Sequence, residues 1–185
     1  MEPVARSADA GRPVPSHRPH IALVGLSGTG KTTLAPLLAG RRHLAVVDLD
    51  REIEQRAGAT AAALFAERGE EEFRDLESEV LRAALDGPPA VIATGGGVVV
   101  RPGNRSLLAL RSTVVWLRAD VESLVARLRG SPQDRPLLAG DPATALRRLA
   151  RERDPLYEEV ADLVVDAASD PAAAIAELVD RELPA

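Results

Sequence analysis

The 185-residue sequence predicts an α/β fold in which helices cover both faces of a parallel sheet. Two observations favour this class. Short apolar runs alternate with longer segments of helical period, as in successive βαβ units. A glycine-rich loop also joins the first apolar run to a helical segment, which is typical of anion-binding α/β folds. The length fits a single domain, and 45% apolar residues suffice for one core.

Five short runs are the candidate strands, because each is mostly β-branched or aliphatic, as in strands buried on both faces. They are Ile21–Val24, Ala45–Val47, Ala90–Ala93, Thr113–Leu117 and Leu163–Val165. The segment before them contains four prolines and no apolar run that could anchor the chain in a membrane. We therefore expect residues 1–20 to form a disordered extension and residues 21–185 to form the domain.

The segments between the strands predict helices. Apolar residues repeat at helical spacing after Phe73, along a helix that begins near Glu70. Two short helices should precede it, ending at Gly58 and Gly69, and Thr60 is the expected N-cap of the second.

The last third of the chain is predicted to hold three further helices, at 120–128, 143–153 and 171–179. The first two flank a stretch rich in proline and glycine, at 131–142. Such a stretch breaks regular structure, and we expect it to form a small mobile lid.

Composition excludes several classes of function. A net charge of −5 argues against a general nucleic-acid-binding protein. The absence of cysteine excludes disulfides and thiolate chemistry, and the three histidines lack metal-ligand spacing. Lys31 is the only lysine, so the chain cannot contain the second lysine that a GTPase needs in its guanine-specificity motif. We expect a cytoplasmic monomer with neither nucleic-acid nor membrane partners.

The segment from Gly25 to Thr32 matches the phosphate-loop pattern G-x-x-x-x-G-K-[ST] in full. Glycines allow successive N–H groups to point at phosphate oxygens, and the following helix adds the positive end of its dipole. Lys31 can then reach the β and γ phosphates of a nucleotide, and the Thr32 hydroxyl can bind Mg²⁺. This motif predicts nucleotide binding.

Two acids, Asp48 and Asp50, follow the second strand in the sequence D-L-D. The carboxyl end of a parallel strand lies beside the ligand crevice, and strand alternation places both side chains on the same side. One carboxylate near Mg²⁺ and another near an acceptor hydroxyl would suit phosphoryl transfer to an alcohol. Solvated turn acids or helix N-caps are the alternative interpretation.

Two further patterns allow both a functional and a structural interpretation. Arg74 and Glu77 have helical i, i+3 spacing, so the carboxylate could orient the guanidinium toward an anionic ligand. A surface salt bridge is the alternative. The glycine run 95–97 follows the third strand and indicates close approach of backbone to a ligand, or a flexible turn.

Six motifs occur in an order that resembles the shikimate kinase family, over about residues 21–178. They are the phosphate loop, D-L-D, G-E-E-E-F-R-D-L-E, G-G-G, R-P-L-L and R-D-P-L-Y. The resemblance implies a three-layer P-loop fold with a five-stranded parallel sheet in the order 2-3-1-4-5, helices on both faces and a small lid. It also implies transfer of the γ-phosphate of ATP to the 3-hydroxyl of shikimate, in the pathway to chorismate and the aromatic amino acids.

The resemblance assigns the ATP and metal sites. Arg135 in R-P-L-L would close over the nucleotide phosphates, Thr32 would bind Mg²⁺, and Asp48 would reach the metal through water. The expected ATP-binding loop residues are Gly28, Thr29, Gly30, Lys31, Thr32 and Thr33. For the adenine contact, Arg127 and Arg129 align about equally well.

The resemblance also assigns the substrate site. Asp50 would hold the ring hydroxyls of shikimate and assist proton removal, while Arg74 and Arg153 would clamp its carboxylate. Gly96 would supply a backbone contact. Lys31, Asp50 and Arg135 are the residues expected to act in catalysis. Phe65 and Phe73, the only phenylalanines, would form a wall of the ring site, although core packing is the alternative.

The sequence also leaves two other classes of function open. A gluconate kinase or a nucleoside-monophosphate kinase would share the architecture, and gluconate also carries a carboxylate and hydroxyls. A nucleotide-dependent binding module, or an inactive homologue, would bind the ligands without transferring phosphate.

Overall fold

The structure, a computed structural model, describes residues 5–7, 18–129, 141–168 and 170–183. The elements in chain order are β1 (Ala5–Ser7), β2 (His20–Val24), α1 (Lys31–Arg42), β3 (Ala45–Asp48), α2 (Leu49–Ala57), α3 (Ala61–Asp86), β4 (Ala90–Ala93), α4 (Pro102–Arg111), β5 (Ser112–Arg118), α5 (Val121–Arg129), α6 (Pro142–Val160), β6 (Leu163–Asp166) and α7 (Ala172–Glu182).

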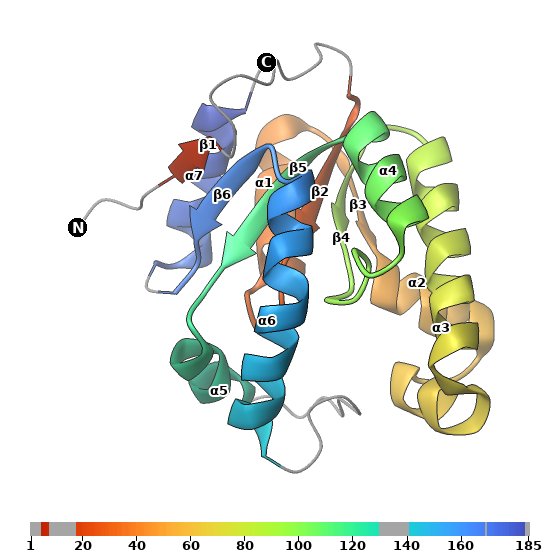
Figure 1. Cartoon of the computed structure of the whole chain (residues 1–185). Helices are drawn as coiled ribbons and strands as arrows, with labels where there is room; N and C mark the ends of the chain where they lie inside the picture. Colours follow the sequence, from red (N-terminus) through yellow and green to blue (C-terminus); the bar gives the residue numbers. More distant parts are fainter. Residues whose placement is uncertain (1–4, 8–17, 130–140, 169, 184–185) are drawn as a thin grey trace.

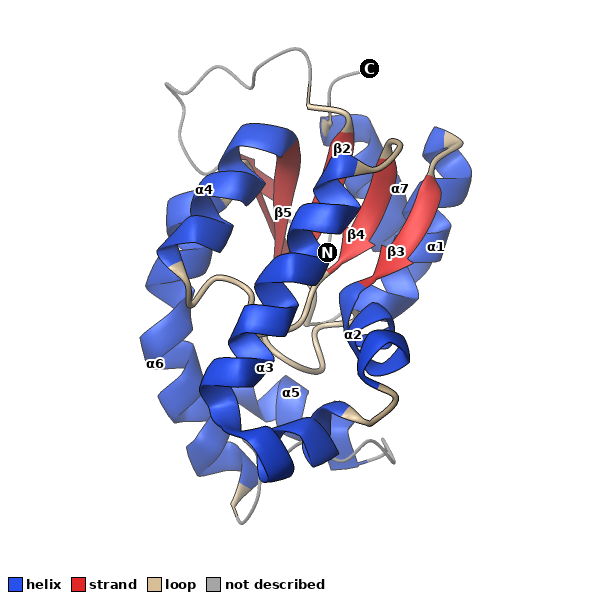
Figure 2. Ribbon diagram, turned by 90° about the vertical axis from the view of Figure 1, so that its right-hand side faces the viewer, coloured by secondary structure: helices blue, strands red, loops and turns tan. Residues whose placement is uncertain are grey.

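The sheet lies between two layers of helices. Helices α1 and α7 cover one face, and α3, α4 and α6 cover the other (Figures 1 and 2). Each face has its own apolar core, because β2, β4 and β5 bury side chains on both sides. Strand β3 differs: Ala45 and Val46 are exposed, since this strand lies at the edge of the sheet. Among the described residues no helix is long and apolar enough to cross a membrane.

Five strands form the predicted parallel sheet. Their spatial order is β3-β4-β2-β5-β6, which is the expected order 2-3-1-4-5. The short strand β1 was not predicted. It pairs antiparallel with the outer edge of β6, with Ala5 opposite Val165. Pairing with an open edge uses backbone groups, so it needs no apolar run in the sequence.

The described residues of the segment that we expected to be a disordered extension contact the domain. Besides β1, Arg18 donates to the Asp162 carboxylate at 2.7 Å, and their side chains are only 4% and 6% exposed. Asp162 also accepts a hydrogen bond from the Val114 N–H at 2.9 Å. The partner of Arg18 lies 144 positions away in sequence, which is why no local pattern indicated the contact.

The caps at the end of α2 and at the start of α3 are as predicted. Gly58 ends α2 with φ of 66°, and the Thr60 hydroxyl accepts from the Ala63 N–H at the start of α3. Gly69 is also as predicted: its φ of 83° and ψ of 173° are not helical, so α3 consists of two helices that meet at a kink at this glycine. Helix α4 was missed, and α6 extends beyond the predicted end through Pro155. Most of the predicted lid, including Arg135, lies outside the described residues.

Candidate functional site

The phosphate loop joins β2 to α1 in a conformation that only glycine adopts readily. Gly25, Gly28 and Gly30 have φ of 139°, 90° and 94°. A Cβ on Gly25 would also overlap the carbonyl oxygen of Leu117. The Lys31 ammonium folds back into the loop and donates to the carbonyls of Gly25 at 2.7 Å and Leu26 at 2.9 Å. The lysine therefore places a positive charge within the curl of the loop.

A hydroxyl and a carboxylate lie together at the end of this loop. The Thr32 hydroxyl donates to the Asp48 carboxylate at 2.9 Å. A hydroxyl and a carboxylate are hard donors of the kind that Mg²⁺ uses together with phosphate oxygens, so these two residues fit that ion. Asp48 is also the N-cap of α2, accepting from the Arg51 N–H at 3.3 Å. The structural and functional interpretations of this acid are thus compatible.

The prediction that strand alternation places Asp48 and Asp50 on the same side was wrong. Strand β3 ends at Asp48, and Asp50 lies in the first turn of α2, so strand alternation does not apply to them. Both residues nevertheless line the same cavity, because the strand-to-helix turn lies at its wall.

This cavity has a volume of about 980 Å³ and lies at the carboxyl ends of the parallel strands. It extends from the phosphate loop to α3 and α6. Every described residue that the sequence analysis assigned to a site lines it: Gly28, Thr29, Gly30, Lys31, Thr32, Thr33, Asp48, Asp50, Arg74, Gly96 and Arg153. Arg135, the remaining assignment, falls outside the described residues.

A buried ion pair forms the α3 side of the cavity. Arg74 donates to Glu77 at 2.8 Å, and their side chains are 4% and 1% exposed, so the alternative of a surface salt bridge is wrong. Arg74 also contacts Glu70 at 3.3 Å. Burial raises the pKa of Glu77, an effect that the guanidinium of Arg74 opposes.

The two phenylalanines hold the same guanidinium. Their rings pack together with centroids 4.6 Å apart. The guanidinium carbon of Arg74 lies 5.7 Å from the Phe65 centroid and 5.4 Å from that of Phe73, within the range of cation–π attraction. The rings therefore wall the cavity and also restrict where Arg74 can point.

The glycine run crosses between α3 and α6. A Cβ on Gly95 would lie 2.7 Å from Asp50 Oδ1 and 3.0 Å from Glu77 Oε1. One on Gly97 would overlap the Arg74 guanidinium. The run is therefore a place of close approach rather than simply a flexible turn, because side chains on either glycine would displace charged groups of the cavity.

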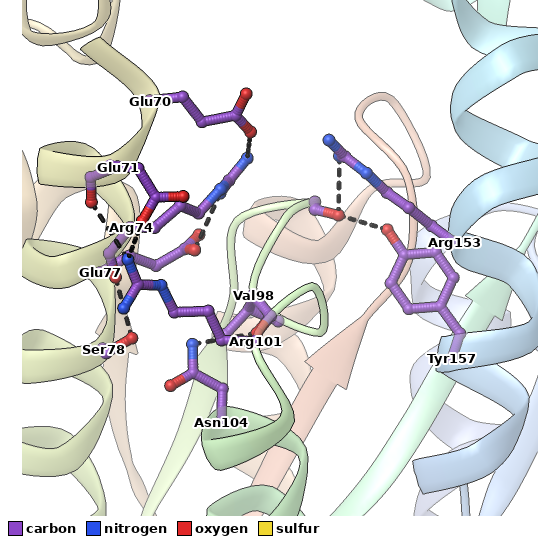
Figure 3. Close-up of polar contacts among 11 residues, drawn as sticks. Glu70, Glu71, Arg74, Glu77, Ser78, Val98, Arg101, Asn104, Arg153 and Tyr157 are labelled. Atoms are coloured by element: carbon purple, nitrogen blue, oxygen red, sulfur yellow. Dashed lines mark hydrogen bonds and ion pairs between the residues drawn. The ribbon is translucent and has the colours of Figure 1, made fainter.

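The α6 side of the cavity contains an arrangement that the sequence analysis missed. The Gly96 carbonyl accepts two hydrogen bonds from α6, one from Arg153 at 3.0 Å and one from the Tyr157 hydroxyl at 2.5 Å (Figure 3). The signal was present in R-D-P-L-Y, where arginine and tyrosine have i, i+4 spacing and so share a helix face.

The two arginines that were left open for the adenine contact differ in their surroundings. Arg127 donates to the carbonyls of Ala167 at 2.5 Å and Ala168 at 2.6 Å, and it reaches Gly28 of the phosphate loop at 3.5 Å. Both arginines are exposed, but only Arg127 is part of the cavity lining.

The cavity thus has one end suited to phosphates and another suited to a carboxylate. The glycine loop at the N-terminus of α1 and the Lys31 ammonium favour phosphate oxygens, and arginine forks favour a planar carboxylate. Asp50 lies on the wall of the same cavity. This arrangement can bring a nucleotide together with a small hydroxylated acid.

Known proteins match most of the chain. The family model described as Shikimate kinase matches residues 27–183. A shikimate kinase of Paracidovorax citrulli is 49% identical over 148 residues, covering 78% of this chain and 80% of the relative.

Solved structures agree with this match. The shikimate kinase of Acinetobacter baumannii, solved in complex with shikimate, has a TM-score of 0.83 and 37% identity over 90% of this chain and 96% of its own. A gluconokinase of Sinorhizobium meliloti reaches a TM-score of 0.55 at 17% identity, covering 85% and 87% of the two chains, which is a likeness of fold alone.

Proposed function

The chain belongs to the shikimate kinase family, and from that premise we propose how its residues divide the work of phosphorylating shikimate. The enzyme transfers the γ-phosphate of ATP to the 3-hydroxyl of shikimate, giving shikimate 3-phosphate and ADP for chorismate and aromatic amino acid synthesis. The observation that carries the residue assignments is one cavity with the phosphate loop at one end and two buried arginines at the other.

At the nucleotide end, Gly28 to Thr33 bind the ATP phosphates through backbone N–H groups and the α1 N-terminus. Lys31 neutralises charge on the β and γ phosphates as the transferring group moves. Its present hydrogen bonds to Gly25 and Leu26 keep the ammonium at the loop until the stronger phosphate oxygens replace those carbonyls.

Thr32 and Asp48 are the residues that would hold Mg²⁺, Asp48 through water. When bound, the ion would neutralise phosphate charge. Arg135, in the part of the chain that the structure does not describe, is assigned to the same phosphates by family resemblance.

At the substrate end, Arg74 and Arg153 bind the shikimate carboxylate from opposite sides of the glycine run (Figure 3). Arginine suits this task because its planar fork gives two parallel hydrogen bonds to a carboxylate. Asp50 accepts hydrogen bonds from the ring hydroxyls and draws the proton from the attacking 3-hydroxyl. Gly96 adds a backbone contact.

We further propose that the enzyme is a cytoplasmic monomer. The absence of cysteine suits a reducing compartment. A single chain supplies the residues assigned to both substrates, so the proposed mechanism needs no second copy. Sedimentation equilibrium would test the monomer, and a mass twice that of the chain would refute it.

A coupled ADP-release assay tests the function. We expect turnover with shikimate and none above background with gluconate or nucleoside monophosphates. Turnover with gluconate alone would overturn the assignment. Affinity for ATP and shikimate without phosphoryl transfer would instead identify an inactive, ligand-binding homologue.

A further inference from the structure

Tyr157 has no part in the mechanism above, yet it is tied directly to the substrate end of the cavity. It is the only tyrosine in the chain, and its side chain is fully buried. Its hydroxyl donates to the Gly96 carbonyl at 2.5 Å, and Arg153 donates to that same oxygen at 3.0 Å (Figure 3). One carbonyl of the glycine run is therefore held by two neighbours from a single helix face.

The tyrosine ring is fixed on its other side. It packs against Trp116 of β5 with centroids 5.8 Å apart and planes inclined by 34°. Burial also raises the pKa of Tyr157, so the hydroxyl remains protonated and donates at every pH at which the enzyme would work. The donor thus has a fixed position and a fixed charge state.

The shared carbonyl sets the orientation of a whole peptide group. Because the peptide between Gly96 and Gly97 is planar and trans, directing its C=O toward α6 turns the N–H of Gly97 away from α6. Glycine cannot hold this orientation by itself, since it has the freest backbone of all residues. The turn bond from the Val98 N–H to the Gly95 carbonyl, at 3.2 Å, spans this peptide, and the hydrogen bonds from α6 add a restraint from outside the loop.

From this arrangement we propose that Tyr157 is a positioning residue for shikimate. Its hydroxyl fixes the Gly96 carbonyl, and through that oxygen it sets both the peptide of the glycine run and the guanidinium of Arg153. Arg153 could not do this alone, because a guanidinium that had to restrain the loop unaided would be less well placed to bind a carboxylate. The inference rests on the proposed function and adds a residue that touches neither substrate.

The test is Tyr157→Phe, which removes the hydroxyl and keeps the ring that packs on Trp116. We expect the KM for shikimate to rise about three- to tenfold, the effect of losing one buried hydrogen bond. The KM for ATP and kcat should stay within about twofold, because the lost contact affects the binding of one substrate only.

A matched control separates positioning from stability. The Ser112 hydroxyl also donates to a buried carbonyl, that of Leu108 at 2.8 Å, but at the amino end of β5, away from the cavity. We expect Ser112→Ala to lower the melting temperature and leave both KM values unchanged. If the two variants raise the KM for shikimate equally, the effect comes from a general loss of protein stability and the inference fails.

A double variant tests the route of action. If Tyr157 acts through the oxygen it shares with Arg153, its hydroxyl should matter less once that arginine is replaced. Calorimetric titration of shikimate should then give a smaller loss from Tyr157→Phe in an Arg153→Lys background than in wild type, and equal losses would overturn the inference. Wild-type protein that releases no ADP with shikimate would refute the proposed function itself, whereas an active wild type with an unaltered Tyr157→Phe variant would refute only the role of Tyr157.

Discussion

Replacing Gly97 with alanine should damage shikimate binding through Arg74 while leaving the nucleotide site intact. The new Cβ would meet the guanidinium of Arg74, and ordinary contact would require that group to retreat by about 1 Å or more. Gly97 does not have a positive φ, so alanine can adopt its backbone conformation. The perturbation is therefore steric and acts on one named side chain.

The guanidinium has little freedom to retreat. It is bonded to Glu77 at 2.8 Å and lies against both phenylalanine rings, with only 4% of its side chain exposed. A carboxylate clamp that loses its alignment forfeits charge-assisted hydrogen bonds worth about 1.5–3 kcal/mol. Because 1.4 kcal/mol corresponds to a factor of ten, the KM for shikimate should rise about ten- to a hundredfold.

Steady-state kinetics with each substrate varied in turn will measure this effect. The KM for ATP should be unchanged, because the phosphate loop lies at the other end of the cavity. Gly103→Ala is the matched control: apart from its chain neighbours and the nearby backbone of α4, no described atom lies within 4 Å of its added Cβ, and its position in α4 favours alanine. A folded Gly97→Ala protein with the wild-type KM for shikimate would refute the placement of Arg74 in the substrate site.

Three other substitutions test separate parts of the site. Lys31→Arg should lower kcat at least about a hundredfold with little effect on the melting temperature, since a planar fork does not fit inside the loop, and full activity in the ADP-release assay would contradict this. Asp48→Asn should raise the Mg²⁺ concentration for half-maximal activity about tenfold and leave the KM for shikimate unaltered; an unchanged magnesium titration would remove Asp48 from the metal site. Glu77→Gln tests the raised pKa of Glu77. The stabilising effect of that raised pKa is complete below the ordinary value of 4.5 and is lost as pH rises through the folded value. The stability of the variant in urea should therefore improve relative to wild type between about pH 4 and 8, and a constant difference would show that Glu77 does not titrate in this way.

The sequence predicts the sheet better than it predicts the contacts around it. Buried parallel strands are visible as apolar runs, and their observed order is the one that the family resemblance implies. Strand β1 and the pair between Arg18 and Asp162 were not predictable, because edge pairing leaves no apolar signature and the two charged residues are separated by most of the chain. Helix α4 was missed because it follows the glycine run and begins at Pro102, where local signals favour a turn.

The candidate site could likewise be predicted only in part from the sequence. A phosphate loop can be predicted from sequence because its function requires consecutive residues, from Gly25 to Thr32. The burial of Arg74 and Glu77 could not be predicted, since i, i+3 spacing is the same for a surface pair and a buried one. Only the packing of α3 against the rest of the fold decides between them, and that depends on the whole chain.

The glycine run connects the two halves of the proposed carboxylate clamp. Arg74 is held from one side by a buried carboxylate, and Arg153 is held from the other by a carbonyl that Tyr157 also binds. Gly97 faces the first arginine, while Gly96 bonds to the second. Movement of this loop would therefore change the separation of the two guanidiniums, and a carboxylate gripped by both depends on that separation. If the proposed clamp holds the substrate carboxylate, specificity for that end of the substrate depends on three residues without side chains, held in place by their neighbours.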